Sequence, residues 1–399
     1  MNTRTRLALA SAAMSALALT APTATAFGSV AAGPEPVPAP LVTAANAVPG
    51  KYIVTLDRTV DAAKAAERLN LKPTFVYEKA INGFAVPLTA TQLDIVRKTP
   101  GVTSVEEDAV TAAPPRPTAP AGARSPAASW GLDRINQENL PLDDDFTAEG
   151  SGAGVTAYIL DTGIDYAHAE FGGRATFGFD AMGDGGAGQD CNGHGTHVAG
   201  TVAGSTYGVA RKANLVSVRV LGCDGRGSYS GMIAGFDWVA RNARQPAVLN
   251  GSLGGDRSTA LNNAATALRT AGVLPVIAAG NSAKDACTVS PASADGTVTV
   301  AASNAWDEET SFSNWGRCVE IYAPGQDIVS AKLGGGSVAL NGTSMAAPHV
   351  AGVAALYKSA HPTASPAEVA AWLDEQSSKD LLTNISPGSP NKLLYTGGL

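Results

Sequence analysis

Residues 155–163 have the sequence VTAYILDTG, in which a run of apolar and β-branched side chains ends at Asp161. A short run of this kind is typical of a strand buried on both faces, as in a parallel sheet. Similar runs occupy 213–220, 247–249, 273–278 and 298–301. Helical patterns begin near Gly195, Gly231, Thr259, Thr343 and Ser365. The alternation predicts an α/β domain from Trp130 to about Tyr395, with a mainly parallel sheet covered by helices.

The composition limits the classes of protein that fit. The chain has 399 residues, a hydrophobic content of 45% and a formal net charge of -7, so a large core is expected. No run of Lys or Arg follows the first residues, so nucleic acid and an anionic membrane are not expected as partners.

The N-terminus has the pattern of a secretory signal peptide. Two arginines within residues 1–6 precede an apolar run over 7–20, and small residues follow at Ala24-Thr25-Ala26. This pattern predicts a signal peptide at 1–26 and a secreted, extracellular protein; a buried N-terminal helix is the alternative. The run is too short to span a membrane, and no other candidate span follows it.

A small unit precedes the α/β domain. Residues 51–56 predict a strand, 61–69 a helix, 74–87 two strands around Asn82-Gly83, 89–98 a helix and 102–106 a strand. The order β-α-β-β-α-β indicates a ferredoxin-like unit at about 51–110. Pro and Ala dominate 111–128, which predicts an extended linker that a protease can cut.

Three residues of the α/β domain are candidates for chemistry. Ser344, in NGTSMAAPH at 341–349, stands in the expected first turn of a helix, where the dipole and unpaired N–H groups stabilise an oxyanion. Taken alone, it would more commonly be an N-cap. His194 lies between glycines and is a candidate general base; with His197 it could bind zinc, but no third ligand is evident. Asp161 ends a buried strand, where α/β sheets build sites, or is a turn residue.

The order of these residues strengthens the hypothesis. Asp161, His194 and Ser344 follow one of the convergent orders of a catalytic triad, that of subtilisin. An esterase of the α/β-hydrolase type would have the order Ser, Asp, His and a GxSxG turn, and residues 342–346 lack the second glycine.

The motifs DTG at 161–163, HGTH at 194–197 and GTSMAAPH at 342–349 together resemble the signatures of the subtilase family. WGLDRI at 130–135 and SPAS at 290–293 are similar to the proteinase K and aqualysin branch. The resemblance implies a subtilisin-like serine endopeptidase at about 123–399, acting through an acyl-enzyme. It also implies a propeptide over 27–122, which assists folding and inhibits the enzyme until the enzyme cuts it off. A catalytically inactive binding protein of the same fold is the alternative.

The resemblance assigns further residues. Asn281 matches an oxyanion-hole asparagine, although it could be only a turn residue. Residues that match the substrate-binding edges and the S1 pocket are Gly225, Gly227, Ser252, Leu253, Gly254, Ala278, Ala279 and Gly280. Their small size predicts backbone pairing with an extended peptide and broad specificity, with a preference for apolar or aromatic P1 residues. Tyr229 matches a residue at the border of the S4 pocket, or packs in the core.

Cysteines and acidic loops complete the expectations. Four cysteines in an exported chain favour disulfides and allow three pairings. The resemblance implies Cys191–Cys223 and Cys287–Cys318. It also implies structural calcium at an N-terminal loop with the oxygen ligands Asp133, Asn136, Gln137, Asp143 and Asp145, and at a second site formed by Asp295, Thr297 and Glu320. No catalytic cofactor is expected. The protein is expected to be a monomer that binds protein and peptide substrates.

Overall fold

Strand β6 (Thr156–Asp161) lies within a nine-stranded sheet with the order β18-β19-β15-β14-β12-β10-β6-β8-β7. Every pairing from β15 to β7 is parallel, as predicted. The other strands are β7 (Ala175–Asp180), β8 (Asn214–Arg219), β10 (Ala247–Gly251), β12 (Leu274–Ala278), β14 (Val298–Ser303), β15 (Ile321–Pro324), β18 (Ser378–Lys379) and β19 (Lys392–Leu393).

The computed structural model describes residues 37–113 and 129–399. The predicted signal peptide at 1–26 and most of the predicted linker at 111–128 lie outside these residues. The stretch Pro38–Leu399 forms one compact unit.

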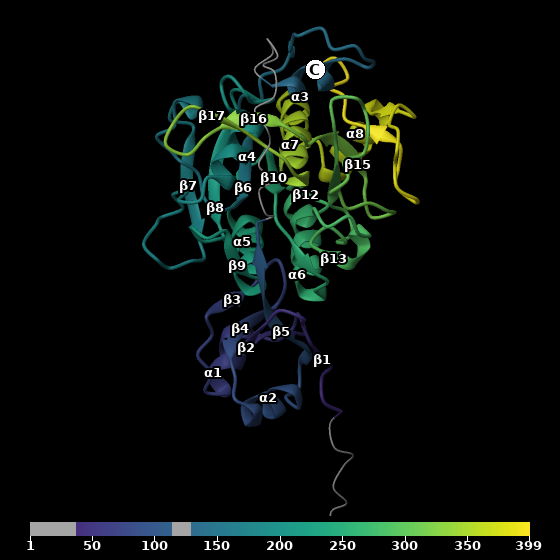
Figure 1. Ribbon diagram of the computed structural model, residues 1–399. Helices are drawn as coiled ribbons and strands as arrows, with labels where there is room; N and C mark the ends of the chain where they lie inside the picture. The colour runs from purple at the N-terminus through teal and green to yellow at the C-terminus, as the bar shows by residue number, and fades with distance from the viewer. Residues whose placement is uncertain (1–36, 114–128) are drawn as a thin grey trace, which may run out of the picture. The chain divides into compact units, whose positions relative to one another are not determined.

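Helices cover both faces of the large sheet. Alternate side chains of β6 belong to different cores, because successive residues of a strand point to opposite faces. Ala157 and Ile159 pack with α4 (His194–Ala203) and α7 (Thr343–Ala360), which lie side by side (Figure 1). Tyr158 and Leu160 pack with the helices on the other face, α5 (Tyr229–Asn242) and α6 (Thr259–Ala267). The predicted α/β fold is confirmed, with three layers.

The remaining elements of the α/β domain are short. They are α3 (Trp130–Asn136), α8 (Pro366–Gln376), the 3-10 turns η1 (Ala169–Phe171), η2 (Leu268–Ala271) and η3 (Ala286–Thr288), the pair β11 (Gly255–Asp256) and β13 (Val289–Ser290), and the hairpin of β16 (Ile328–Ala331) and β17 (Ser337–Leu340). The sequence did not predict β7 or β15. Strand β7 is an edge strand in which Phe177 is exposed, and β15 has four residues, so neither shows a long buried run.

The N-terminal unit has the predicted β-α-β-β-α-β order. Its elements are β2 (Ala47–Leu56), α1 (Ala62–Arg68), β3 (Phe75–Tyr77), β4 (Gly83–Pro87), α2 (Ala90–Arg97) and β5 (Val102–Ala112), preceded by β1 (Leu41–Val42). Asp61 caps α1, and Thr89 with Gln92 forms a capping box at α2. The structure starts this unit before the expected residue 51.

The sheet of the N-terminal unit has two buried faces. Val54 and Phe84 pack in the unit's own core with α1. Their neighbours Ile53 and Ala85 point to the other face and share a core cluster with α5 and α6. The unit therefore packs on the α/β domain by the face that its own helices leave open.

Strand β5 continues past the expected boundary at residue 110. Thr111 and Ala112 were expected in the linker, but they extend β5 and pair antiparallel with β9 (Arg226–Ser228). The correction has a tertiary cause: β9 offers backbone groups at an edge, and Thr111 and Ala112 continue β5 by pairing with them.

Candidate active site

Asp161 and His194 meet where β6 ends and α4 begins. The Nδ1 atom of His194 lies 2.7 Å from Oδ1 of Asp161, and the Thr162 amide donates to the same oxygen at 2.7 Å. Both side chains are buried. Gly195 permits this approach, because a Cβ there would lie 2.1 Å from the carbonyl oxygen of Gly163. A carboxylate in this position fixes the tautomer of the imidazole and leaves Nε2 able to accept a proton.

Ser344 is the second residue of α7 and follows the N-cap Gly342. Its hydroxyl donates to the carbonyl of Ser252 at 3.2 Å, and Ser252 Oγ donates to the carbonyl of Ser344 at 2.9 Å. Asn250 supports this pair, because its Nδ2 donates to Ser252 Oγ at 2.8 Å. The Ser344 hydroxyl thus donates to the residue that follows β10.

Asn281 lies in the loop after β12, against the start of α7. Its Oδ1 accepts the amide and the hydroxyl of Thr343, each at 2.8 Å. Its Nδ2 is buried and has no hydrogen-bond partner among the described residues. A Cβ added to Gly342 would lie 2.9 Å from that nitrogen, so the amide lies directly beside the turn that carries Ser344. A buried, unpaired donor next to a candidate nucleophile is what an oxyanion hole requires.

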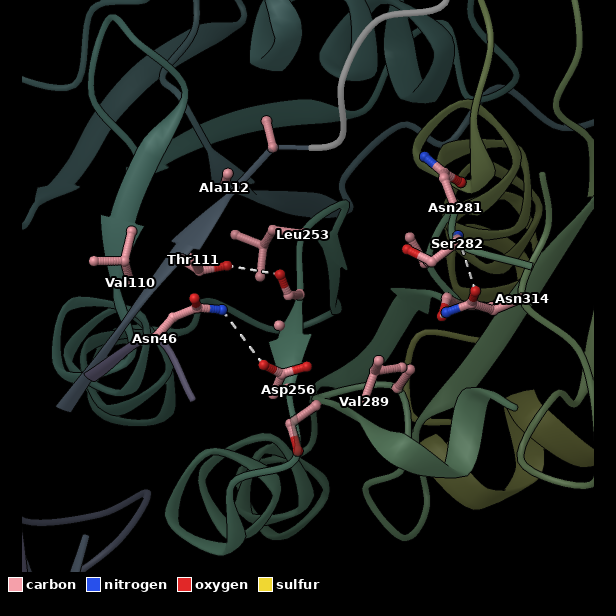
Figure 2. A pocket seen from close by; sticks show the side chains of 18 of the residues that line it. Asn46, Val110, Thr111, Ala112, Leu253, Asp256, Asn281, Ser282, Val289 and Asn314 are labelled. Atoms are coloured by element: carbon pink, nitrogen blue, oxygen red, sulfur yellow. Dashed lines mark hydrogen bonds between the residues drawn. The ribbon is translucent and has the colours of Figure 1, made fainter. Parts of the chain in front are cut away.

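A cavity of about 600 Å³ opens beside Asn281. Leu253, Gly254 and residues 278–280 line it, as do Val289 and Asn314. Figure 2 shows Leu253 and Asp256 on one side of the cavity and Ser282 and Asn314 on the other. The expected S1 residues therefore do surround one cavity, whose walls consist largely of small side chains.

The end of β5 lies along this cavity as an extended strand. Thr111 pairs with Gly227 and Ala112 with Arg226, and Ala112 also forms a bridge with Gly254 on the opposite edge. The amide of Ala113 donates to the carbonyl of Gly225 at 2.7 Å. The two glycine-rich edges therefore hold a peptide strand between them by backbone hydrogen bonds, in the way predicted for a substrate.

Tyr229 occupies a core position. Its side chain is 3% exposed and packs in the cluster of α5, and its hydroxyl donates to the carbonyl of Asp256 at 2.8 Å. A Cβ at Gly255 would lie 2.3 Å from that hydroxyl, so the ring supports the strand that forms one cavity wall. Tyr229 is not one of the described residues that line the cavity.

Both predicted disulfides are present. Cys191 pairs with Cys223 and Cys287 with Cys318, with Cα atoms 4.9 and 5.2 Å apart. The first links the loop before His194 to the loop before β9, and the second links η3 to the segment before β15. His197 is buried on α4 and contacts the hairpin of β16 and β17, with Nε2 3.0 Å from the Ile328 carbonyl.

The residues of the first predicted calcium group lie on one loop and are joined by hydrogen bonds. Asp133 is buried, which raises the pKa of its carboxyl group, and it accepts the amides of Asp143 and Asp144 at 3.3 and 2.8 Å. Oδ1 of Asn136 is buried and without a partner among the described residues. Gln137 uses its amide within the loop: Oε1 accepts the Asp143 amide, and Nε2 donates to the carbonyl of Pro141. The Asp145 amide bonds Oδ1 of Asp143. The orphaned Asn136 oxygen suits a hard cation, but among the described residues Asp133, Asp143 and Asp145 do not form a group of three arranged to hold a metal ion.

The second predicted group fits a cation less completely. Glu320 and Thr297 line a cavity of about 150 Å³, and partial desolvation raises the pKa of the Glu320 carboxyl although the residue is exposed overall. The carbonyl of Asp295 already accepts the Thr266 hydroxyl at 2.9 Å. Arg269 lines the same cavity, so a fixed positive charge already lies there. Within the described ranges, no group of three His, Cys, Asp or Glu residues is arranged to hold a metal ion.

The sequence did not predict the carboxylates by which the N-terminal unit is hydrogen-bonded to the α/β domain. Glu106 of β5 accepts the Ser258 hydroxyl and the Ala260 amide at the start of α6. Asp108 accepts the amide and hydroxyl of Ser230 at the start of α5. Burial raises the pKa of both carboxyl groups. Their spacing of two along β5, which puts both on one face, was the available signal.

Asp237 of α5 was also missed. Its Oδ1 accepts the consecutive amides of Glu78, Lys79 and Ala80 at 2.9, 2.7 and 2.9 Å. No sequence signal marks an acidic residue on an otherwise apolar helix face for this role. In the part of the chain that the structure describes, no helix is long and apolar enough to cross a membrane.

The chain matches known proteins along most of its length. The subtilase family matches residues 152–392, and the peptidase inhibitor I9 family matches residues 51–113. Alkaline serine exoprotease A of Vibrio alginolyticus is 44% identical over 380 residues, which cover 91% of this chain and 71% of that protein. The extracellular serine proteinase of Thermus sp. (strain Rt41A) is 44% identical over 393 residues, which cover 92% and 94%.

A solved structure agrees with these relatives. The crystal structure of a cold adapted subtilisin-like serine proteinase has 51% sequence identity and a TM-score of 0.66, covering 67% of this chain and 97% of that one. The family match spans Asp161, His194, Asn281 and Ser344, and the inhibitor match ends at the strand held in the cleft. The chain therefore belongs to the subtilase family of serine proteases, with an I9 inhibitor domain ahead of the peptidase domain.

Proposed function

We propose that this protease hydrolyses peptide bonds through an acyl-enzyme formed on Ser344. His194 takes the proton of the Ser344 hydroxyl and returns it to the leaving amine, while Asp161 orients the imidazole and stabilises its charged form. The Asn281 amide and the Ser344 backbone N–H donate to the oxyanion. The observation that carries the proposal is the 2.7 Å bond between two buried groups, Asp161 and His194, beside the unpaired Asn281 amide.

The cavity supports a preference for apolar or aromatic P1 side chains. The walls at Leu253, Gly254 and residues 278–280 are small and apolar, and the rest of the cavity is lined partly by residues 110–113 of the N-terminal unit, so the whole volume is not that of the P1 pocket. Specificity at the flanking positions is broad, because the edges at Gly225, Gly227 and Gly254 bind the peptide backbone.

The enzyme is made as a precursor that is exported by the signal peptide at 1–26 and cuts its own linker. The I9 domain, which we place within 27–122, inhibits the peptidase domain at 123–399 by leaving the end of β5 in the cleft. The Thermus relative is named an extracellular proteinase, and an extracellular monomer that degrades proteins fits this chain as well.

Calcium stabilises the folded enzyme without taking part in the reaction. Asp133, Asn136, Gln137, Asp143 and Asp145 would hold it through their oxygen atoms, which hard cations favour, in a loop where the Arg134 guanidinium already donates to the backbone carbonyl of Gln137 at 2.7 Å. Asp295, Thr297 and Glu320 form the second candidate site, where Arg269 competes with a cation.

One experiment tests the proposed function. The mature protein, treated with a serine-directed sulfonyl fluoride, should take up one label per chain at Ser344, and Ser344→Ala should leave an exported precursor with an uncut linker. No label on Ser344 in folded, mature protein would favour an inactive binding protein. Normal linker cleavage in Ser344→Ala would assign processing to another protease.

A further inference from the structure

Three charged side chains are among the described residues that line the large cavity: Arg226, Asp256 and Lys284. Asp256 and Lys284 form an ion pair, with Nζ 3.5 Å from Oδ1 and side chains 47% and 40% exposed. The other lining residues named above are apolar, small or uncharged. Charge selection in this cavity therefore depends on very few groups.

The two partners come from separate walls and have fixed backbones. Asp256 lies in β11, paired with Val289 of β13, and its carbonyl accepts the Tyr229 hydroxyl. Lys284 follows Asn281 in the loop, where its amide donates to Oδ1 of Asn314 at 3.2 Å and its carbonyl accepts the Trp315 amide at 3.1 Å. The charges thus stay at the cavity when the side chains exchange partners.

The precursor already shows that Asp256 can take another partner. The side chain of Asn46 in the inhibitor domain lies on the same carboxylate, with Nδ2 3.5 Å from Oδ2 (Figure 2). Removal of the inhibitor domain exposes this oxygen to the cavity. A substrate side chain can then approach the carboxylate or the ammonium group of the pair.

We propose that Asp256 and Lys284 set the charge preference for the P1 side chain: Asp256 attracts basic residues, Lys284 attracts acidic ones, and each offsets the other in the natural enzyme. The inference rests on the proposed function, because it places the P1 pocket in this cavity. When a substitution neutralises one partner, the charge of the other is no longer offset and acts on the P1 side chain. Since both are about half exposed, each such substitution should change selectivity by about three- to tenfold.

The test uses tetrapeptide p-nitroanilides that differ only in a last residue of Phe, Glu or Lys. Ratios of kcat/KM, per site titrated with sulfonyl fluoride, are compared for Asp256→Asn and Lys284→Met. Asp256→Asn should raise the Glu/Phe ratio about fivefold and lower the Lys/Phe ratio similarly, with Arg226 adding to the positive field. Lys284→Met should do the reverse, and the double variant should cancel both shifts.

Two controls make the result specific. Asp380→Asn and Lys332→Gln change the net charge by the same amounts at exposed positions that do not line the cavity, and they should leave the ratios within about twofold. The shifts should shrink when salt rises from about 20 mM to about 500 mM. Ratios that stay constant in both cavity variants, or that move in the same direction, would overturn the proposal. Failure of the proposed function would instead appear as natural enzyme that does not cleave the Phe substrate.

Discussion

The two polar atoms of the Asn281 side chain have different environments. Oδ1 fixes the start of α7 by accepting from Thr343, and Nδ2 stays buried without an acceptor in the described structure. A buried donor without a partner costs about 1–3 kcal/mol, and the proposed oxyanion would supply the missing acceptor during the reaction.

Asn281→Asp separates the effects of these two atoms, because aspartate keeps an acceptor for Thr343 and loses the donor. We expect kcat to fall by roughly 10²–10³ with little change in KM, since the donor acts only on the charge of the transition state. Steady-state kinetics on protein matured in trans by immobilised natural enzyme measures this. A kcat within about threefold of the natural enzyme would remove Asn281 from the oxyanion hole.

Among the elements, helix α7 contains one histidine, His349, which serves packing. His349 is buried, its Nδ1 lies 2.8 Å from the Met345 carbonyl, and burial lowers its pKa from 6.5 to about 4. A Cβ at Gly131 would lie 2.7 Å from its Nε2, so α3 packs directly on the ring. The imidazole therefore remains neutral where an exposed histidine would be charged.

This predicts a loss of stability in acid. Between pH 6.5 and about 4 the folded state binds fewer protons than the unfolded state, so the free energy of unfolding falls as the pH falls, by about 3 kcal/mol at pH 4. Chemical denaturation of the Ser344→Ala precursor should show this slope. His349→Gln should reduce it, and His361→Gln, at an exposed histidine that ends the same helix, should not. Equal slopes in all three proteins would contradict the assignment.

The loop after α3 carries most of the first proposed calcium group. We expect EDTA to lower Tm, because a ligand at about 100 times its dissociation constant adds about 2.7 kcal/mol to stability. Asp133→Asn should abolish the response if the first group binds the ion, whereas Glu320→Gln should do so if the second group does. An unchanged Tm of the natural enzyme in excess EDTA would exclude both sites.

At the scale of the whole molecule, the inhibitor domain is held at both ends of its contact. The strand at 110–112 lies in the cleft, and the turn at 78–80 donates three amides to Asp237, whose other oxygen lies 2.9 Å from Nε of Arg241. Glu106 and Asp108 lie between these contacts, on the starts of α6 and α5. Release of the inhibitor therefore requires more than cleavage of the linker.

Asp237→Ala should weaken this complex after processing. It leaves three amides without an acceptor, at a cost of about 1–3 kcal/mol, which is roughly a five- to hundredfold increase in the dissociation constant of the cleaved inhibitor domain. The lag before proteolytic activity appears should shorten. Asp380→Asn, which removes the same charge at an exposed site, serves as the control, and an unchanged lag in Asp237→Ala would show that the contact is dispensable.

The sequence predicted the elements that carry local signals. The buried runs ending at Asp161 and before Asn281, the glycine-flanked His194 and the small-residue turn before Ser344 each contain their pattern within a few residues. The order of the three candidate residues indicated the fold and the chemistry together. These features depend on local conformational preferences and on the order of residues along the chain, and neither changes when the chain folds.

The tertiary structure alone decided which atoms meet. Asp237 contacts amides 157 to 159 residues away, and Thr111 joined β5 because β9 lay beside it. Likewise, the Asn281 amide acquired one bound oxygen and one free nitrogen only when α7 packed against it, and Asp256 met Lys284 across a cavity. Such pairings form only when segments that are distant in the sequence approach one another, so no local sequence pattern predicts them.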